Sequence, residues 1–539
     1  MADERKARAT PPTAELREQP GPSDTRELLR RTQETRHRRE GQPQGAGKVR
    51  RRLPTAAWIC FGVALLNAIA WGLITPLFQV PDEAGHVAYV QRIAETGKPP
   101  AGKFDVQHFS QEQRHLIDTI RWKAVQRKKD VRVPGTASYG KNLERDVSTS
   151  YGRANKGGYT TDTNNPPLYY FTAAGVYHLS PWTSLPDRVH FLRLLSALLA
   201  ACTVLLVFLF LRELLPGTPW AWTVGALAVA FQPMFAFTSS GVTSDTVLYL
   251  ASAGIFYTLA RAFRRGLTRN GGLAIGGFAA LGILSKMNMV GLAPGILVGL
   301  GALVLRERRG RRGEAFDGVL AAVAVVLVPL GIYMLLNSTV WHRGLYFASG
   351  VQGPTGIVVP GKAETVSATV GDAFNYMWQF YLPRLPSMDS LFAFYPLREI
   401  WFNGFIGDFG WLDTRFASWV YDLALVIGIG IVVLAAREIV RCWSVIRTRL
   451  AELITYLTLM AGLLLLIGGV SYIARIGGAA GYEQPRYLLP LMALYGALVA
   501  IAARGAGKRY GPAAGVFLVC LAVAHSVAAM LLTLTRFYG

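Results

Sequence analysis

Long apolar runs recur along the chain and alternate with short polar segments. Each run is close to the roughly 20 residues with which an α-helix crosses the hydrocarbon core of a bilayer. The pattern predicts an all-α fold, a polytopic transmembrane helical bundle of about eleven spans within residues 53–539. The expected spans are 54–77, 190–211, 219–237, 244–262, 272–286, 288–305, 317–336, 417–436, 450–472, 486–503 and 512–534.

Basic residues fall in alternate loops between these runs. If the N-terminus is cytoplasmic, all the basic loops lie on the cytoplasmic side, as the positive-inside rule requires. We therefore expect a multi-pass protein of the inner (plasma) membrane. The loops hold Arg212; Arg261, Arg264, Arg265 and Arg269; Arg306, Arg308, Arg309, Arg311 and Arg312; Arg437, Arg441, Arg447 and Arg449; and Arg504, Lys508 and Arg509.

The N-terminal segment 1–52 differs from the rest of the chain. It is rich in Arg, Glu, Pro, Gln and Gly, and it has few large apolar residues. Such a segment cannot bury enough apolar surface to offset its ordering entropy, so we expect a disordered basic cytoplasmic tail. The net charge of +22 does not indicate nucleic acid as a partner, because the basic residues are clustered between apolar runs.

Two long segments, 78–189 and 337–416, are expected on the outer face. The first contains many Lys and Arg residues, but long loops translocate largely regardless of charge. Within it, the apolar piece 166–179 has only about 14 residues and begins with Pro166 and Pro167. Counting it as a span would place every later basic loop outside, so we expect a helix that lies on the membrane or re-enters it.

An acidic motif follows the first span. Asp82 and Glu83 lie at the expected outer boundary, and His86 lies on the same face if the segment is helical. A carboxylate at this depth suits a general base that deprotonates an acceptor hydroxyl. The alternative is a solvated helix cap at Asp82. Glu83-x-x-His86 has metal-ligand spacing, but this signal alone is weak. We expect no cofactor or metal, with a divalent ion as the alternative.

Four more charged residues are expected near the same membrane depth. Asp245 lies at the outer end of the fourth span, where an acid usually has a partner or a function, or caps the helix. Arg193, Lys286 and Arg486 lie at the outer ends of other spans. Such cations could hold a lipid-linked phosphate. The alternative for each is contact with lipid headgroups.

Several short motifs resemble those of a bacterial membrane-protein family, domain of unknown function 2142. Pro81-Asp82-Glu83-Ala84-Gly85-His86 followed by Tyr89 resembles its acidic signature, and Gln484-Pro485-Arg486-Tyr487-Leu488-Leu489-Pro490 resembles its late motif. The layout from about 54 to 500 is also similar to the GT-C superfamily of lipid-phosphosugar glycosyltransferases. The order of motifs carries this second resemblance: the acidic motif, Pro166 to Tyr170, Arg193-Leu194-Leu195-Ser196, and Ser244-Asp245.

The resemblance implies an inverting transferase that uses a polyprenyl-phosphate-linked sugar and a glycan or lipid acceptor. Asp82 would bind and deprotonate the acceptor, Asp245 would orient the acceptor or a cation, and aromatic residues of 337–416 could stack on sugars. Arg193, Arg486 and Lys286 would stabilise the phosphate. The candidate catalytic residues are Asp82, Glu83 and Asp245, and the candidate substrate-binding residues are His86, Arg193, Lys286, Gln484, Arg486 and Tyr487.

Two other functions are compatible with the pattern. A transporter or flippase of lipid-linked sugars is one, although neither internal repeats nor broken helices are visible in the sequence. The other is a non-catalytic membrane scaffold of a cell-wall complex that uses its basic tail as a docking segment.

Overall fold

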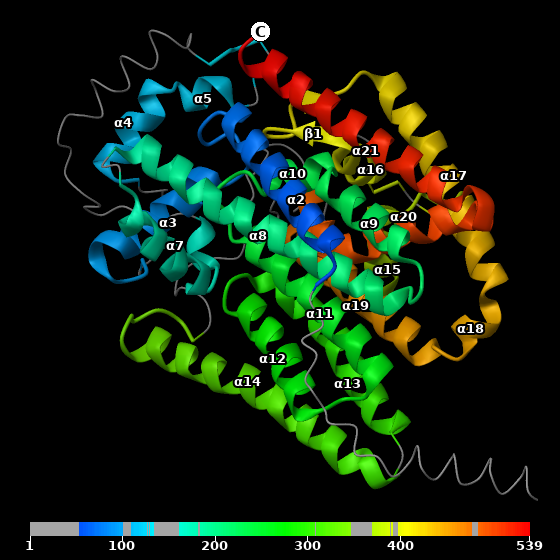
Figure 1. The fold of residues 1–539 in the computed structure, drawn as a ribbon. Coiled ribbons are helices and arrows are strands. Elements are labelled where there is room, and N and C mark those ends of the chain that lie inside the picture. The colour runs from blue at the N-terminus through cyan, green and yellow to red at the C-terminus, as the bar shows by residue number, and fades with distance from the viewer. Residues whose placement is uncertain are drawn as a thin grey trace, which may run out of the picture. The chain divides into compact units, whose positions relative to one another are not determined.

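Nine helices in the described part of the chain are long and apolar enough to cross a membrane. They match nine of the expected spans, and the predicted all-α polytopic bundle is confirmed (Figure 1). These segments are α2 (Thr55–Ile74), α8 (Leu185–Leu214), α11 (Asp245–Arg265), η2 with α13 (Met287–Leu292, Ala293–Arg306), α14 (Arg312–Thr339), α17 (Ser418–Arg441), α19 (Leu450–Ile476), η4 with α20 (Pro485–Leu491, Met492–Gly505) and α21 (Gly507–Phe537).

The structure is a computed structural model of the whole chain. It describes residues 53–100, 109–126, 128, 130–133, 161–181, 184–307, 309–345, 369–388, 390–391, 397–476 and 483–539. The predicted disordered tail, 1–52, lies outside the described residues.

Two of the eleven expected spans are not among these nine helices. The run 219–237 is divided into α9 (Pro219–Ala230) and α10 (Pro233–Thr238). Pro233 cannot continue the hydrogen-bond ladder of α9, and the Gln232 side chain accepts from the backbone of the next turn. The run 272–286 forms α12 (Arg269–Ile283), which has 15 residues. Hydropathy alone gives no sign of the break at Gln232.

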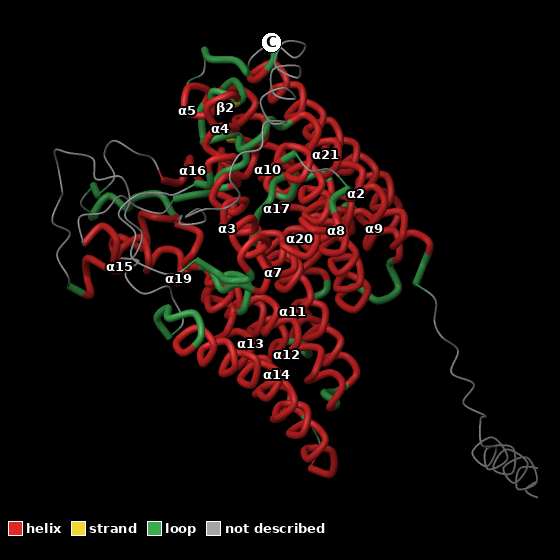
Figure 2. Tube along the Cα trace, turned by 90° about the vertical axis from the view of Figure 1, so that its left-hand side faces the viewer, coloured by secondary structure: helices red, strands yellow, loops and turns green. Residues whose placement is uncertain are grey.

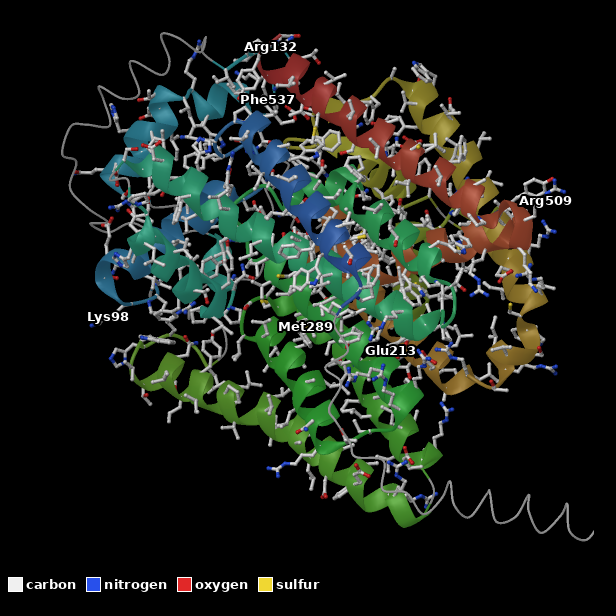
Figure 3. The ribbon with its side chains drawn as sticks, in the orientation of Figure 1. Lys98, Arg132, Glu213, Met289, Arg509 and Phe537 are labelled. Atoms are coloured by element: carbon white, nitrogen blue, oxygen red, sulfur yellow. The ribbon has the colours of Figure 1, made fainter. Side chains whose placement is uncertain are left out.

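Buried glutamates pair with partly exposed arginines at one end of the bundle, here called the arginine end. Glu213 at the end of α8 pairs with Arg264, 3.1 Å away, and with Arg265 (Figure 3). Glu438 of α17 pairs with Arg504 of α20 at 3.1 Å. Each glutamate therefore joins two helix ends that the positive-inside rule placed on the same side.

The opposite end of the bundle carries the two long loops. The first holds α3 (Glu83–Thr96), α4 (Gln111–Thr119), α5 (Trp122–Val125), η1 (Thr161–Asn164) and α7 (Leu168–Leu179). The second holds α15 (Val370–Tyr381), α16 (Leu397–Gly407) and the antiparallel strands β1 (Asp408–Phe409) and β2 (Thr414–Arg415), the small sheet visible in Figure 2. The remaining short helices are η3 (Arg309–Arg311) and α18 (Trp443–Arg447).

Helix α7 occupies most of the apolar piece 166–179. Its 12 residues extend about 18 Å at 1.5 Å per residue, which is too short to span a bilayer core. It packs against α3 and α8, and Tyr169 and Tyr170 are buried in that contact. The prediction of a short helix here instead of a twelfth span is confirmed.

The first long loop is also fastened to the end of α21. The backbone N–H of Val133 donates to the carbonyl of Phe537 at 3.0 Å, and Arg132 donates to the carbonyl of Gly539 at 2.6 Å (Figure 3). Arg536 donates to the carbonyl of Val125 and pairs with Asp413 of the second loop at 3.0 Å. The two long loops and the last helix thus support one another.

Glycine allows α12 to lie against α14. Gly272 and Gly276 are four residues apart and so lie on one face of α12. A Cβ atom at Gly276 would lie 2.4 Å from the carbonyl oxygen of Ala322, and one at Gly272 would lie 1.8 Å from that of Gly318. Small residues at this spacing let membrane helices approach closely. Much of α14 is otherwise exposed.

We expect Gly276→Ala to destabilise the fold by about 1–3 kcal/mol, because the added methyl group meets backbone that must shift. Thermal unfolding in detergent would show a lower midpoint temperature. Gly277→Ala is the matched control, since a Cβ there meets nothing within 4 Å. Equal midpoints for the two variants would contradict the close helix contact.

Candidate functional site

Glu83 and Arg193 form a buried pair that joins the first long loop to α8. Arg193 donates through Nε to Oε1 of Glu83 at 2.8 Å and through Nη2 to Oε2 at 2.7 Å. The backbone N–H groups of Phe78 and Val242 also donate to this carboxylate, at 2.8 Å and 3.0 Å. Glu83 therefore holds three separate segments of the chain together.

Arg193 has no N–H group left for a ligand. Besides its two bonds to Glu83, it donates to the carbonyls of Gly72 at 2.8 Å, Thr75 at 2.7 Å and Pro76 at 3.0 Å. A guanidinium has five N–H donors, and all five are used. The prediction that Glu83 is catalytic and that Arg193 binds phosphate remains untested, but this geometry favours a positioning role for both.

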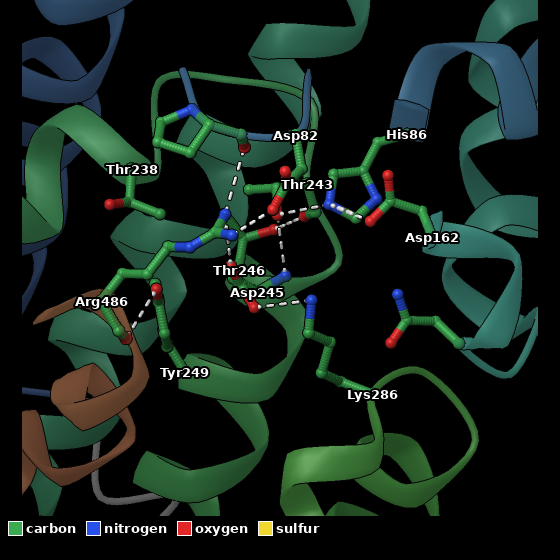
Figure 4. Close-up of polar contacts among 12 residues, drawn as sticks. Asp82, His86, Asp162, Thr238, Thr243, Asp245, Thr246, Tyr249, Lys286 and Arg486 are labelled. Atoms are coloured by element: carbon green, nitrogen blue, oxygen red, sulfur yellow. Dashed lines mark hydrogen bonds and ion pairs between the residues drawn. The ribbon is translucent and has the colours of Figure 1, made fainter. Parts of the chain in front are cut away.

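Asp82 lies immediately before α3, yet its side chain does not cap that helix. Its carboxylate pairs instead with Nη2 of Arg486, and Nη1 of Arg486 donates to the carbonyl of Pro81 at 3.1 Å (Figure 4). Asp82 has φ +64°, the left-handed region that Asn and Asp tolerate better than other non-glycine residues. Its side chain is 30% exposed, whereas that of Arg486 is 3% exposed. The cap interpretation of Asp82 is thus not supported by its contacts.

The environment of Asp82 keeps it ionised. Burial raises the pKa of this carboxyl, but the positive charges of Arg486 and Lys286 outweigh burial and hold the pKa below its ordinary value. Asp82 is therefore a carboxylate at neutral pH. It is the most exposed charged group of the cluster, so a ligand can reach it.

Asp245 forms ion pairs with two cations of the site, Lys286 and Arg486. As the first residue of α11, it pairs with Nζ of Lys286 at 3.1 Å and with Nη1 of Arg486 at 3.3 Å. Lys286 lies in extended backbone between α12 and η2, where the helical run is interrupted. The structure therefore brings four predicted site residues together: Asp82, Asp245, Lys286 and Arg486 (Figure 4).

His86 lies on α3, one turn after Asp82, and is fully buried. Its Nδ1 is 2.8 Å from the hydroxyl of Tyr170, and its Nε2 is 3.2 Å from the hydroxyl of Thr243. Burial, and then the charge of Lys286, lowers the pKa of His86 to about 3. It is therefore neutral at pH 7 and acts as a hydrogen-bonding group.

Asp162 of η1 also reaches this cluster, although the sequence analysis did not identify it. Its Oδ1 lies 3.5 Å from Nε2 of His86. Burial, and then the charge of Asp82, raises the pKa of Asp162 to about 8. Both partners are uncharged at pH 7, so the contact is polar and not ionic. One signal was available: Asp162 lies just before the Pro166 to Tyr170 motif.

The other predicted binding residues lie at the edge of the cluster. Gln484 and Tyr487 flank Arg486 in the chain, and both are half-buried. The guanidinium of Arg486 lies 5.4 Å from the centre of the Tyr487 ring. The Gln484 side-chain oxygen is buried and has no hydrogen-bond partner among the described residues. No group of three or more His, Cys, Asp or Glu in the described ranges could hold a metal ion.

Aromatic residues of the second long loop pack mainly on one another. Tyr376 is fully buried and stacks on Phe380, with ring centres 5.6 Å apart. Trp401 packs on Phe380 at 5.3 Å, and Trp411 packs on Trp122 of the first loop at 6.1 Å. These rings hold the loops together. Their role in sugar stacking stays a prediction.

Comparison with protein families agrees with the motif analysis. The model of domain of unknown function 2142, described as a predicted membrane protein, matches residues 65–495. The chain belongs to this family. The match extends from α2 to α20 and includes every candidate residue from Asp82 to Tyr487. A search of curated proteins found no match. For this member of family 2142, the resemblance to that family is confirmed, the resemblance to the GT-C superfamily stays a prediction, and the protein is a multi-pass membrane protein.

Glu83 and Arg193 should show strong energetic coupling. Glu83→Gln or Arg193→Met leaves one buried charge without its partner, and we expect each to destabilise the protein by about 3–5 kcal/mol. The double variant should lose much less than the sum of the two, since neither charge then remains. Thermal midpoints in detergent would measure this cycle. Additive losses would show that the pair does not act as a unit.

Proposed function

We propose that this chain is a membrane glycosyltransferase that moves a sugar from a polyprenyl-phosphate donor to a cell-envelope glycan or lipid acceptor, with inversion. One observation carries the proposal: Asp82 is an ionised, partly exposed carboxylate that lies directly beside a cluster of cations. Such a transfer needs a base for a hydroxyl and positive charge for a departing phosphate. The motif order shared with GT-C enzymes supports the same reaction.

In the proposed reaction, Asp82 accepts the proton of the acceptor hydroxyl. The acceptor oxygen bonds to the anomeric carbon of the sugar as the bond from that carbon to the phosphate oxygen breaks, and the electron pair stays on the phosphate. Lys286 is placed to contact this phosphate, because its side chain is 10% exposed. Arg486 is almost fully buried, so it would act mainly through its ion pairs with Asp82 and Asp245.

Donor binding would also activate the base. A phosphate beside Lys286 and Arg486 offsets part of the positive charge that lowers the pKa of Asp82. The pKa of Asp82 then rises toward the reaction pH, where a general base is most effective. The same cations would thus keep Asp82 ionised in the free enzyme and make it a better base in the complex.

The position of the arginine end supports a particular orientation of the protein in the membrane. Since Lys and Arg favour the cytoplasmic side, the site would open on the outer face of the plasma membrane. Glycan and lipid acceptors of the cell envelope would meet the donor there.

A transporter of lipid-linked sugars is the second candidate, and a helix break favours it. The chain is interrupted between α9 and α10, where the run 219–237 is divided at Gln232. Discontinuous helices line substrate sites in many transporters. Translocation of a sugar-lipid across vesicles without transfer would support this function over the enzyme.

Asp82→Asn should abolish transfer while leaving the fold intact. Asn tolerates the left-handed backbone at this position, but its amide cannot accept the proton. We expect the rate to fall by at least about 10²–10⁴-fold. The assay incubates purified protein with a panel of polyprenyl-phosphate sugars and a cell-envelope extract, and it measures the release of polyprenyl phosphate.

Asp118→Asn is the control for this assay, because Asp118 is an exposed carboxyl of α4 in the same loop. It should retain the native rate. An active Asp82→Asn protein would exclude Asp82 as the base, and an inactive native protein with every donor would contradict the proposed function.

Lys286→Met should lower kcat by about 10²-fold, because one positive group near the departing phosphate is removed. Lys286→Arg should restore part of this loss, since it keeps the charge. Lys98→Met, at an exposed lysine after α3, is the matched control. If Lys286→Met keeps its thermal midpoint and also keeps native kcat, Lys286 does not stabilise the phosphate.

A further inference from the structure

Asp162 is held in place by contacts that no sequence motif indicated. Arg343, which follows α14, donates to the carbonyl of Thr163 and to the hydroxyl of Tyr89 at 3.3 Å. The backbone N–H of Asn165 donates to the carbonyl of Asp162 at 2.9 Å. The Tyr89 ring stacks on Tyr170, with ring centres 3.8 Å apart. The segment that carries Asp162 is therefore fixed against α3 and α7.

The charged and imidazole side chains of this cluster differ in how much of their surface is exposed. Asp82, Lys286 and Asp162 keep 30%, 10% and 9% of their side-chain surface exposed. The other five are at most 3% exposed: Glu83, His86, Arg193, Asp245 and Arg486. Among these eight groups, Asp162 is thus one of three whose side chain is more than 3% exposed.

Asp162 and Arg486 lie on opposite sides of Asp82 (Figure 4). Figure 4 shows Arg486 on one side of Asp82 and Asp162 with His86 on the other, while Lys286 approaches Asp245 from below. An in-line displacement places the incoming oxygen and the departing phosphate on opposite sides of the reacting carbon. The phosphate is attracted to the cations. The side of Asp82 that faces Asp162 is therefore left for the incoming hydroxyl.

The protonation of Asp162 suits an uncharged ligand. Its pKa of about 8 leaves the carboxyl protonated at pH 7, so it can donate a hydrogen bond as well as accept one. Among the described residues, the charged and titratable groups that face it from the neighbouring elements include Asp82, His86, Tyr170, Asp245, Lys286 and Arg486.

We propose that Asp162 binds the acceptor, and that its carboxyl donates a hydrogen bond to an oxygen of a neutral acceptor sugar while Asp82 takes the proton of the attacking hydroxyl. This inference rests on the proposed function and assigns the acceptor to one side of the site. The acceptor is then an uncharged saccharide. An anionic sugar would be disfavoured beside Asp82 and Asp245, because Lys286 and Arg486 are already paired with these two carboxylates.

The test compares Asp162→Asn and Asp162→Ala by transfer kinetics. The donor is the polyprenyl-phosphate sugar that the native protein uses, and the acceptor probes are para-nitrophenyl glycosides of neutral hexoses and pentoses. Asp162→Ala should raise the acceptor KM at least tenfold and leave the donor KM within about twofold. Asp162→Asn should stay within about threefold of native, since its amide also donates. Asp118→Asn should change neither KM.

The pH profile separates binding from a purely structural role. Because a raised pKa keeps Asp162 protonated below about pH 8, the native acceptor KM should rise as the pH increases beyond 8. In Asp162→Asn this alkaline rise should disappear, because the amide does not titrate. The Asn variant alone suffices for this comparison if the Ala variant does not fold.

Three outcomes would overturn the inference. Loss of kcat in Asp162→Asn, as in Asp82→Asn, would make Asp162 a base. A raised donor KM in Asp162→Ala would place Asp162 on the donor side. An unchanged acceptor KM in Asp162→Ala, with an unchanged pH profile in Asp162→Asn, would remove Asp162 from the site. If the native protein transfers no sugar, calorimetry measures whether the same glycosides bind to the native protein and to Asp162→Ala. Binding lost in Asp162→Ala supports a saccharide site without transfer, and no binding to native protein refutes it.

Discussion

The buried pair of Glu83 and Arg193 is the interaction on which the site depends. Two ionised groups away from water are stable only when their hydrogen-bonding capacity is satisfied. Here Arg193 uses all five N–H donors, and Glu83 accepts from Arg193 and from two backbone N–H groups. These bonds join the end of α2, the start of α3, α8 and the segment before α11. Removing either charge would release all four.

Asp82 occupies its position because its neighbour is fixed in this way. Glu83 is the first residue of α3, and its bonds hold that end of the helix in place. The chain turns sharply just before it, and Asp82 takes up a left-handed conformation. Such a conformation is unfavourable for most side chains and persists when the surroundings determine it. It turns the Asp82 carboxylate toward Arg486, 404 residues further along the chain. A structural pair thus positions a neighbouring carboxylate that remains partly exposed.

The sequence predicted the bundle and the convergence of charges, but not how those charges pair. Hydropathy and loop charge depend on local composition, so the spans and the short helix at 166–179 could be predicted. Arg193 and Arg486 looked equivalent in sequence, since both are cations near a span end. Only the tertiary arrangement shows that Arg193 is fully used by Glu83 and three backbone carbonyls, whereas Arg486 pairs with Asp82. Asp162 was not predicted because its segment reaches the site through contacts with Arg343, far away in the chain.

The balance of charge at the site explains why a base and a phosphate site would lie so close together. Asp82 and Asp245 are offset by Lys286 and Arg486, while His86 and Asp162 are neutral at pH 7. In the proposed reaction the departing phosphate gains a negative charge at the moment when Asp82 loses its own by accepting a proton. The total charge near the cations stays constant. In a poorly solvated site a change in net charge is costly, so this arrangement favours proton transfer and phosphate departure as one coupled event.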